Sequence, residues 1–300
     1  MQLHGTSQIN DEGQLEIGGI QATDLVAQFG TPLYVMDEQF IRERCRGYMK
    51  AFQGSGLDFQ VAFASKSFCV MAMCRLVEEE GLSLDVVSDG ELHTALQAGF
   101  PADRIHFHGN NKTPAEIEMA LDANIGCFVV DNFVEMQMLN ALAAEKGKQA
   151  DILLRITPGI EAHTHEFIST GQIDSKFGFD LGNGAAFQAA DEARSLSNIQ
   201  LLGIPSHIVS QIFEVEGFRY AVEKVSEFAI ELENKLGIMI RVINLGGGFG
   251  IRYTEGDTPL PVSHYVSAIT EAVKDKFASL NAPLPQIWIE PGRSIVGVAG

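Results

Sequence analysis

A pattern that repeats eight times constrains the fold of this 300-residue chain more than any other feature. Nearly continuous apolar stretches alternate with stretches in which apolar residues recur at i, i+3 and i+4, the spacing of an amphipathic helix. Apolar stretches of this kind are typical of strands buried on both faces of a parallel sheet. The expected strands cover residues 57–65, 82–88, 104–109, 125–131, 151–159, 201–210, 241–248 and 286–292. The helices expected between them cover residues 68–81, 90–100, 113–123, 133–147, 183–195, 214–237 and 261–280.

Eight such repeats favour an α/β fold, a closed (β/α)8 barrel of the TIM type. An open doubly wound sheet is the alternative, because strand counts from a single sequence err easily. The preceding segment, residues 31–52, predicts one additional strand and helix outside the repeat. An eighth helix after the last strand is expected to be missing.

The composition indicates which kinds of partner this protein is suited to bind. Apolar residues make up 46% of the chain and charged residues 20%, which is typical of a soluble globular protein. The net charge of −18 argues against nucleic acid and anionic membranes as partners, because both attract basic surfaces. Four cysteines without a CxxC pair, no signal peptide and no apolar stretch long enough to span a membrane predict a cytoplasmic protein.

If the chain forms a barrel, its functional residues should gather at the carboxyl ends of the strands. Polar residues and glycines do follow the expected strands at these positions. They are Lys66, Asp85, Ser88, His108, Asn110, Asp131, Arg155, His207, Ser210, the glycines after Asn244, Glu290 and Arg293.

Lys66 follows an apolar strand, and no acidic residue lies within the surrounding stretch VAFASKSFCV. A lysine at a strand end most often extends its ammonium group into water. The alternative is an amine that bonds covalently to a carbonyl compound, which requires a partly desolvated site. This stretch alone does not decide between them.

Two further stretches favour the binding of an anion. The consecutive glycines of NLGGGFG, residues 244–250, let backbone N–H groups approach a phosphate, although a tight turn alone would also need glycine. In IEPGRS, residues 289–294, Arg293 could hold an anion and Glu290 a cationic ring nitrogen, or the two could form a surface ion pair.

A histidine on its own is a weaker indication of a functional site. His207 and Ser210 lie at the end of the sixth strand, where a lone histidine is more often a core residue. His163 and His165 suggest a metal, but no set of cysteines and carboxylates completes a coordination sphere, so no metal site is predicted. Together with Lys66, the glycines and the Glu290–Arg293 pair, His207 and Ser210 form the set that a pyridoxal phosphate site requires.

The sequence resembles the diaminopimelate decarboxylases, members of the alanine-racemase-like (fold type III) pyridoxal-phosphate enzymes. The resemblance extends over essentially the whole chain, and "HTHEFISTG" followed by "DSKFGF" points to the diaminopimelate branch. The other matching stretches are TPLYVMDE, FASKSF, LSLDVVSDGEL, ALQAGFPADRIHFHGNNKT, VVDNFVEM, SHIVSQIFE, INLGGGFGIRY and IEPGRSIV.

The resemblance implies a role for each candidate residue. Lys66 would be the catalytic residue that attaches the cofactor covalently, and Asp85 and Arg155 would lie beside the attachment point. His207 would stack on the ring, and Glu290 would pair with its nitrogen. The phosphate would be held by Ser210, Gly246, Gly247, Gly248 and Arg293, with Pro291 and Gly292 completing the motif; Arg293 would also bind substrate.

The resemblance further implies decarboxylation of meso-2,6-diaminopimelate to L-lysine and carbon dioxide, the last step of lysine biosynthesis. The substrate is then a small amino acid, and the family's active form is a homodimer. Residues 1–45 would belong to the family's β-domain and residues 46–300 to the barrel, while the C-terminal β-domain is expected to be absent.

Three residues depart from the family's pattern and keep alternatives open. Val209 replaces a glycine, Pro205 removes an N–H group from the sixth strand, and Asp89 adds a negative charge near the rim. A non-catalytic homologue that binds pyridoxal phosphate weakly, or acts as the partner of an intact enzyme, is therefore one alternative. A decarboxylase of ornithine, lysine or arginine is another.

Overall fold

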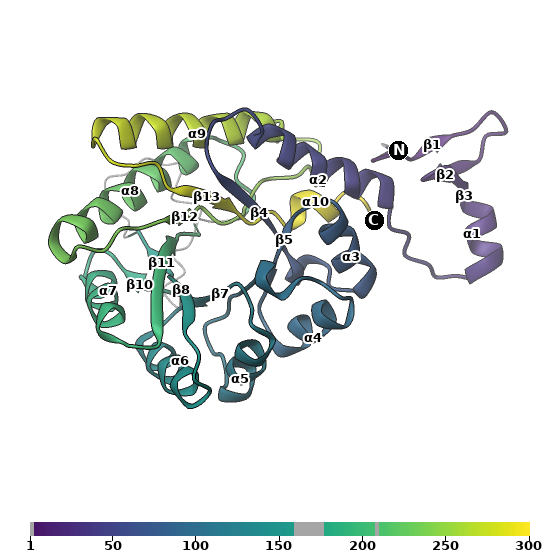
Figure 1. Cartoon of the computed structure of the whole chain (residues 1–300). Coiled ribbons are helices and arrows are strands. Elements are labelled where there is room, and N and C mark those ends of the chain that lie inside the picture. Colours follow the sequence, from purple (N-terminus) through teal and green to yellow (C-terminus); the bar gives the residue numbers. More distant parts are fainter. Residues whose placement is uncertain (1–2, 159–176, 208–209) are drawn as a thin grey trace.

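A closed barrel of eight parallel strands forms the body of the molecule, in a computed structural model that describes residues 3–158, 177–207 and 210–300 (Figure 1). The predicted α/β fold of the (β/α)8 type is therefore confirmed. Each strand pairs with its neighbour in parallel register, and β13 pairs with β4 to close the ring. The strands are β4 (Phe59–Ala64), β5 (Ser83–Val86), β6 (Ile105–Phe107), β7 (Cys127–Val130), β8 (Ala150–Leu154), β11 (Ile199–Pro205), β12 (Val242–Asn244) and β13 (Gln286–Ile289).

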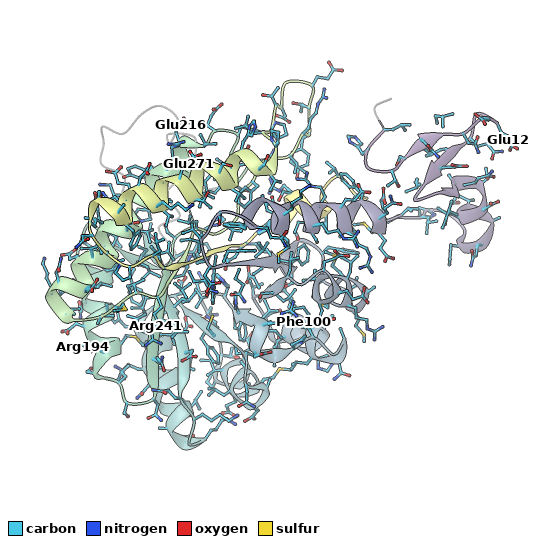
Figure 2. The ribbon with its side chains drawn as sticks, turned by 45° about the horizontal axis from the view of Figure 1, so that its top comes forward. Glu12, Phe100, Arg194, Glu216, Arg241 and Glu271 are labelled. Carbon is cyan, nitrogen blue, oxygen red and sulfur yellow. The ribbon has the colours of Figure 1, made fainter. Side chains whose placement is uncertain are left out.

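Helices cover the outside of this barrel, and each expected helix is present within the predicted ranges or close to them. They are α3 (Met71–Glu79), α4 (Asp89–Gln97), α5 (Pro114–Ala123), α6 (Phe133–Glu145), α7 (Ala185–Ser195), α8 (Glu216–Leu236) and α9 (Val262–Ser279). Polar side chains such as Glu216 on α8 and Glu271 on α9 lie on the outer surface (Figure 2). A short pair of parallel strands, β9 (Ile156–Thr157) and β10 (Phe179–Asp180), is added after β8.

The helix before the barrel, α2 (Glu38–Phe52), corrects one prediction. It does not lie outside the repeat, because it packs against α9 and its buried residues Ile41, Cys45, Tyr48 and Phe52 belong to the main core. The helix after β13, α10 (Arg293–Val296), has only four residues. In the layer around the barrel, α2 therefore lies between α9 and α10, which it contacts.

Hydrogen bonds tie α2 to α10. The buried Tyr48 hydroxyl lies 2.6 Å from the Ser294 hydroxyl, and the Arg44 guanidinium donates to the Ser294 carbonyl oxygen at 2.9 Å. The main-chain N–H of Asp37, the residue that caps α2, donates to the carbonyl oxygen of Ala299 at 2.7 Å. Segments from the two ends of the sequence therefore form one seam of the barrel.

We expect the Tyr48→Ala variant to lose about 3–5 kcal/mol of unfolding free energy, because it removes a fully buried ring from this seam. Tyr48→Phe should lose only about 1 kcal/mol, the usual value of one hydrogen bond. Tyr34→Ala is the control, since Tyr34 is 97% exposed and its loss should change stability by less than about 0.5 kcal/mol. Urea denaturation measures all three; equal losses for Tyr48→Ala and Tyr34→Ala would contradict the assignment of α2 to the barrel.

The N-terminal segment lies beside the barrel rather than on it. It contains the antiparallel strands β1 (Gln8–Ile9), β2 (Leu15–Ile17) and β3 (Ile20–Gln21) and the helix α1 (Ala22–Phe29), which has no buried residue. Figure 2 shows Glu12 of this segment far from the barrel. The strand expected within residues 31–37 is not formed. The predicted boundary between residues 45 and 46 falls inside α2.

Two of the three departures are accommodated by the fold. Pro205 pairs with Asn244 at the end of β11, and the next N–H, from Ser206, donates to the Asn244 carbonyl oxygen at 2.8 Å. Asp89 is exposed in the first turn of α4, where the helix dipole favours a negative charge. Val209, like His163 and His165, lies outside the described residues. Among the helices that the structure describes, none is both long and apolar enough to cross a membrane.

Candidate active site

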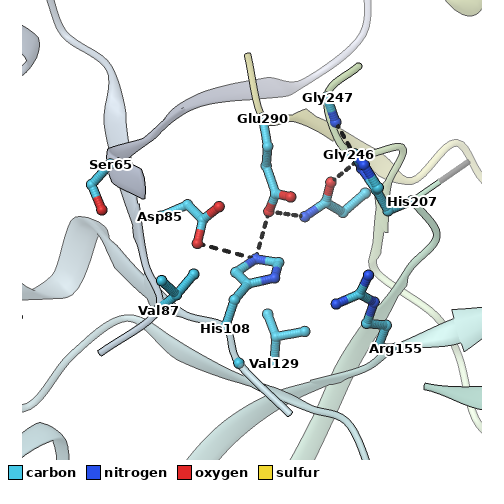
Figure 3. A network of polar contacts seen from close by, with 12 residues as sticks. Ser65, Asp85, Val87, His108, Val129, Arg155, His207, Gly246, Gly247 and Glu290 are labelled. Atoms are coloured by element: carbon cyan, nitrogen blue, oxygen red, sulfur yellow. Dashed lines mark hydrogen bonds and ion pairs between the residues drawn. The ribbon is translucent and has the colours of Figure 1, made fainter. Parts of the chain in front are cut away.

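The predicted site residues all lie at the carboxyl ends of the barrel strands. Lys66 follows β4, Asp85 lies within β5, and Arg155 follows β8. His207 and Ser210 come after β11, Gly246–Gly248 after β12, and Glu290 to Arg293 after β13. Figure 3 shows Asp85, Arg155, His207, Gly246, Gly247 and Glu290 arranged around one space, with the ring of His108 among them.

Lys66 lies in a single 3-10 turn, Ser65–Ser67, and its side chain is exposed. The turn is joined to the end of β13, because Ala64 N–H donates to the Pro291 carbonyl oxygen at 3.2 Å. Gly292 lies so close that a Cβ atom there would be 3.0 Å from the Ala64 Cβ and from the Ser67 hydroxyl oxygen. This packing fixes the Lys66 turn relative to Glu290.

The carboxylate of Glu290 is buried and receives two hydrogen bonds on the same oxygen. His108 Nε2 lies 2.7 Å from Oε1, and Asn244 Nδ2 donates to it at 2.5 Å (Figure 3). Burial by itself would raise the pKa of Glu290, but the positive charge of His108 and these two bonds hold that pKa well below its usual value. Glu290 is therefore a carboxylate that stays negative inside the barrel.

Asp85 lies on the other side of His108, with its Oδ1 3.8 Å from His108 Nε2. That oxygen is buried and accepts no hydrogen bond among the described residues. Burial and the nearby Glu290 charge raise the pKa of Asp85 to about 7, although His108 and Lys66 oppose the shift. The pKa of His108 is raised in turn, because the two carboxylates outweigh the effect of its burial. His108 therefore lies between two carboxylates whose pKa values are shifted in opposite directions.

We expect Asp85 to make the protein less stable as the pH rises. A carboxyl group whose pKa is raised on folding favours the folded state below its unfolded pKa, near 4, and loses this contribution as the pH rises through its folded pKa, near 7. Relative to Asp85→Asn, the unfolding free energy of the natural protein should fall by about 2–3 kcal/mol between pH 5 and pH 8.

Urea denaturation at several pH values measures this difference. Asp122→Asn is a suitable control, because Asp122 is exposed and its pKa is lowered by Lys146, so nothing should change between pH 5 and pH 8. Parallel pH profiles for the natural protein and Asp85→Asn would show that Asp85 is ionised throughout this range.

The glycines after β12 form a turn that packs closely against His207 and the end of β13. Gly246 and Gly248 have φ angles of 67° and 88°, which disfavour other residues. A Cβ atom on Gly246 would be 2.6 Å from His207 Nδ1, and one on Gly247 would be 2.2 Å from the Glu290 carbonyl oxygen. Glycine is therefore required here by both conformation and space.

His207 lies beside this turn, with Gly247 N–H donating to its Nδ1 at 3.4 Å. The ring keeps an exposed surface, yet the protein atoms around it and the positive charges of Lys66 and Arg155 lower its pKa. A neutral ring with an accessible face is suited to stacking on another ring.

Arg155 and Arg293 add two further positive charges to the site. Arg155 pairs with Asp131 at 3.6 Å and lies 4.2 Å from the centre of the Phe177 ring. Arg293 lies 5.7 Å from the centre of the Tyr253 ring and is partly exposed, and Ser210 is exposed. Asn244 joins Glu290 to Gly246, and Gly247 N–H donates to His207, so these predicted residues form one hydrogen-bonded chain.

Two residues of this centre had been given no role by the sequence. His108 and Asn244 both stand at strand ends, which is the signal that could have identified them. Asn244 donates to Glu290 and also accepts from Gly246 N–H at 2.8 Å, so it joins the carboxylate to the glycine turn. A strand-end position alone does not tell which neighbour a side chain will contact.

Comparison with known proteins identifies the family. The family model described as "Pyridoxal-dependent decarboxylase, pyridoxal binding domain" matches residues 38–297. The diaminopimelate decarboxylases of Halalkalibacterium halodurans and Bacillus subtilis are 57% and 56% identical over 300 residues, which is 100% of this chain and 68% of each relative. The crystal structure of diaminopimelate decarboxylase from M. jannaschii with L-lysine is 37% identical, with a TM-score of 0.92 over 99% of this chain and 69% of that chain. The chain therefore belongs to the pyridoxal-dependent decarboxylases.

Proposed function

We propose that this protein binds pyridoxal phosphate at the carboxyl ends of its barrel strands and decarboxylates meso-2,6-diaminopimelate to L-lysine and carbon dioxide. The observation that carries the proposal is the buried, negative carboxylate of Glu290, which shares the barrel mouth with Lys66 and the glycine turn. The high identity to diaminopimelate decarboxylases supports the choice of reaction.

The residues present fit this cofactor. The glycine turn carries no side chains, which suits the close approach of a phosphate to backbone N–H groups. Asp85 Oδ1 is a buried acceptor without a hydrogen-bond donor among the described residues, and Glu290 is a carboxylate suited to a protonated ring nitrogen. Lys66 supplies an amine, Arg293 a cationic partner for the phosphate, and His207 a neutral imidazole.

Pyridoxal phosphate, when bound, supplies an electrophilic aldehyde and a ring that accepts the electron pair released when the bond to the carboxylate breaks. Lys66 would provide the amine that bonds to this aldehyde and is released when the amino group of the substrate replaces it. Glu290, kept ionised by His108 and Asn244, would keep a proton on the ring nitrogen, which strengthens the electron demand of the ring.

The remaining residues would orient the two molecules. Gly246, Gly247, Gly248, Ser210 and Arg293 would hold the phosphate, with Pro291 and Gly292 fixing Arg293 next to the Lys66 turn. His207 would cover one face of the ring. Asp85 and Arg155 would lie near the reacting amine, and Arg293 would also meet the substrate.

Among the alternatives, decarboxylation of ornithine, lysine or arginine has less support. The lysine/ornithine decarboxylase of Vibrio vulnificus is 24% identical with a TM-score of 0.74, a likeness that extends to the fold alone. A non-catalytic homologue is less favoured because Pro205 and Asp89 leave β11 and the start of α4 intact.

The assembly state, the location and the domain organisation of the protein are also inferred. We infer that the active protein is a homodimer and that it is located in the cytoplasm, where its four free cysteines would stay reduced. We also infer that the N-terminal segment before α2 belongs with a second domain. Sedimentation at several concentrations of the purified protein, with and without cofactor, would test the first.

Covalent capture tests the cofactor proposal. The purified protein is incubated with pyridoxal phosphate, reduced with borohydride and digested, and the modified peptide is identified by mass spectrometry. We expect a pyridoxyl group on Lys66 alone. No adduct, or adducts spread over surface lysines, would overturn the proposal.

Release of carbon dioxide tests the reaction. The cofactor-loaded protein is supplied separately with meso-2,6-diaminopimelate, ornithine, lysine and arginine. We expect turnover with diaminopimelate at least about 100-fold faster than with the others, because a site that binds the distal carboxylate of diaminopimelate rejects analogues that lack it. Equal rates would favour a less selective amino-acid decarboxylase.

A further inference from the structure

Lys112, in the loop between β6 and α5, is buried in an unusual way. Only 1% of its side chain is exposed, and all three ammonium hydrogens have an acceptor. Lys112 Nζ donates to the carbonyl oxygens of Gly109 and Val129 at 2.8 and 2.7 Å and to Glu135 Oε1 at 2.7 Å. A lysine is rarely buried unless it is paired, so this arrangement calls for an explanation.

Glu135, the partner of Lys112, also accepts a hydrogen bond from Asp131, just after β7. Its side chain is 3% exposed, and its other oxygen, Oε2, accepts from the main-chain N–H of Asp131 at 3.1 Å. Asn132, the cap of α6, accepts from Glu135 N–H at 2.9 Å, which fixes the backbone that carries the carboxylate. Lys112 and Glu135 thereby join the loop after β6 to the end of β7.

Both ends of this contact lie next to the candidate active site. Gly109 directly follows His108, the residue bonded to Glu290, and it has a φ of 109° and lies against the Val87 carbonyl oxygen. Asp131 pairs with Arg155 at 3.6 Å. Figure 3 shows His108 and Arg155 on the same side of the site, with Val129, the second carbonyl partner of Lys112, between them.

We propose that Lys112 is a positioning residue, which acts through Gly109 to place His108 against Glu290 and through Glu135 and Asp131 to place Arg155. The inference rests on the proposed function, because it describes how two residues of that site are held. Lys112 and Glu135 would then affect cofactor binding and turnover as well as stability.

The test separates positioning from stability with four variants of the purified protein. Lys112→Met and Glu135→Gln each remove one partner. The double variant Lys112→Met/Glu135→Leu replaces the ion pair by apolar side chains, which often restores stability to a buried site. Lys148→Met is the control, because Lys148 also donates to a carbonyl oxygen, that of Leu121, and to Asn124 Oδ1, and it is not part of the Figure 3 site.

Four quantities are measured: the melting temperature, the dissociation constant for pyridoxal phosphate, and kcat and KM for diaminopimelate. We expect Lys112→Met to weaken cofactor binding about tenfold and to lower kcat by about 10–100-fold, since small displacements of reacting groups have effects of this size. The double variant should regain the melting temperature of the natural protein without regaining kcat. Lys148→Met should match the natural protein in kcat and in cofactor affinity.

Recovery of kcat and cofactor binding in the double variant would overturn the inference, as would unchanged values in Lys112→Met. If the natural protein itself fails to bind the cofactor, the proposed function fails, and the inference is then decided by NMR titration of the His108 ring. In that case Lys112→Met and the double variant should both bring the pKa of His108 closer to 6.5, and an unchanged His108 titration in both would overturn it.

Discussion

Lys66→Ala is expected to abolish decarboxylation, with a loss of about 10⁴-fold or more in kcat, as is usual when a covalent catalytic residue is removed. The variant should fold with unchanged stability, because Lys66 is exposed in its turn and the packing of that turn depends on Ala64, Ser67 and Gly292. The measurement combines turnover of diaminopimelate with borohydride capture. Lys66→Ala should yield no specific pyridoxyl peptide.

Two comparisons sharpen this result. Lys66→Arg keeps the positive charge, so it should bind the anionic cofactor more tightly than Lys66→Ala while remaining inactive. Lys148→Ala, a lysine elsewhere on the barrel, should retain full capture at Lys66. Turnover in Lys66→Ala within tenfold of the natural protein would remove Lys66 from the reaction.

Glu290→Gln is expected to have the second largest effect, a loss of about 10²–10³-fold in kcat, the size seen when one electrostatic partner of a reacting group is removed. The variant keeps the shape of Glu290 but loses the charge that His108 and Asn244 stabilise at 2.7 and 2.5 Å. Without that charge, the ring nitrogen should lose its proton near neutral pH. The absorbance spectrum of the bound cofactor reports this change independently of turnover.

Glu271→Gln provides the matched control. Glu271 lies on α9 with 65% of its side chain exposed and pairs only loosely with Arg219, at 3.6 Å (Figure 2). The change should leave kcat and the spectrum as they are, and stability within about 0.5 kcal/mol. If Glu290→Gln behaves like Glu271→Gln, the ring nitrogen has a different partner.

The barrel could be predicted from the sequence because its signal is local. Each strand, such as Cys127–Val130, is a short apolar run, and each helix, such as Val262–Ser279, shows a continuous amphipathic period. Functional residues of such barrels gather at the carboxyl ends of the strands. Lys66, Asp85, His207 and Glu290 could therefore be placed at one end of the barrel before any contact between them was known.

What the sequence did not reveal depends on contacts between distant residues. The amphipathic period of α2 shows that one face is buried, but not that this face packs against α9 and α10 at the far end of the chain. In the same way, His108 is one of many polar residues at the strand ends, and Lys112 looks like an ordinary residue of a loop. Only the fold shows that Glu290, 182 positions from His108, is its hydrogen-bond partner.

The seam between α2 and α10 has a consequence for how the protein is made. Tyr48 and Ser294 are separated by 246 positions, and β4 cannot pair with β13 until Gln286–Ile289 has been synthesised. A nascent chain therefore emerges from the ribosome with the apolar face of α2 and one edge of β4 uncovered until β13 and α10 have been synthesised. Such long-range closure slows folding and leaves surfaces that chaperones bind. The helix that joins the two ends of the barrel in the finished protein is thus left exposed during translation.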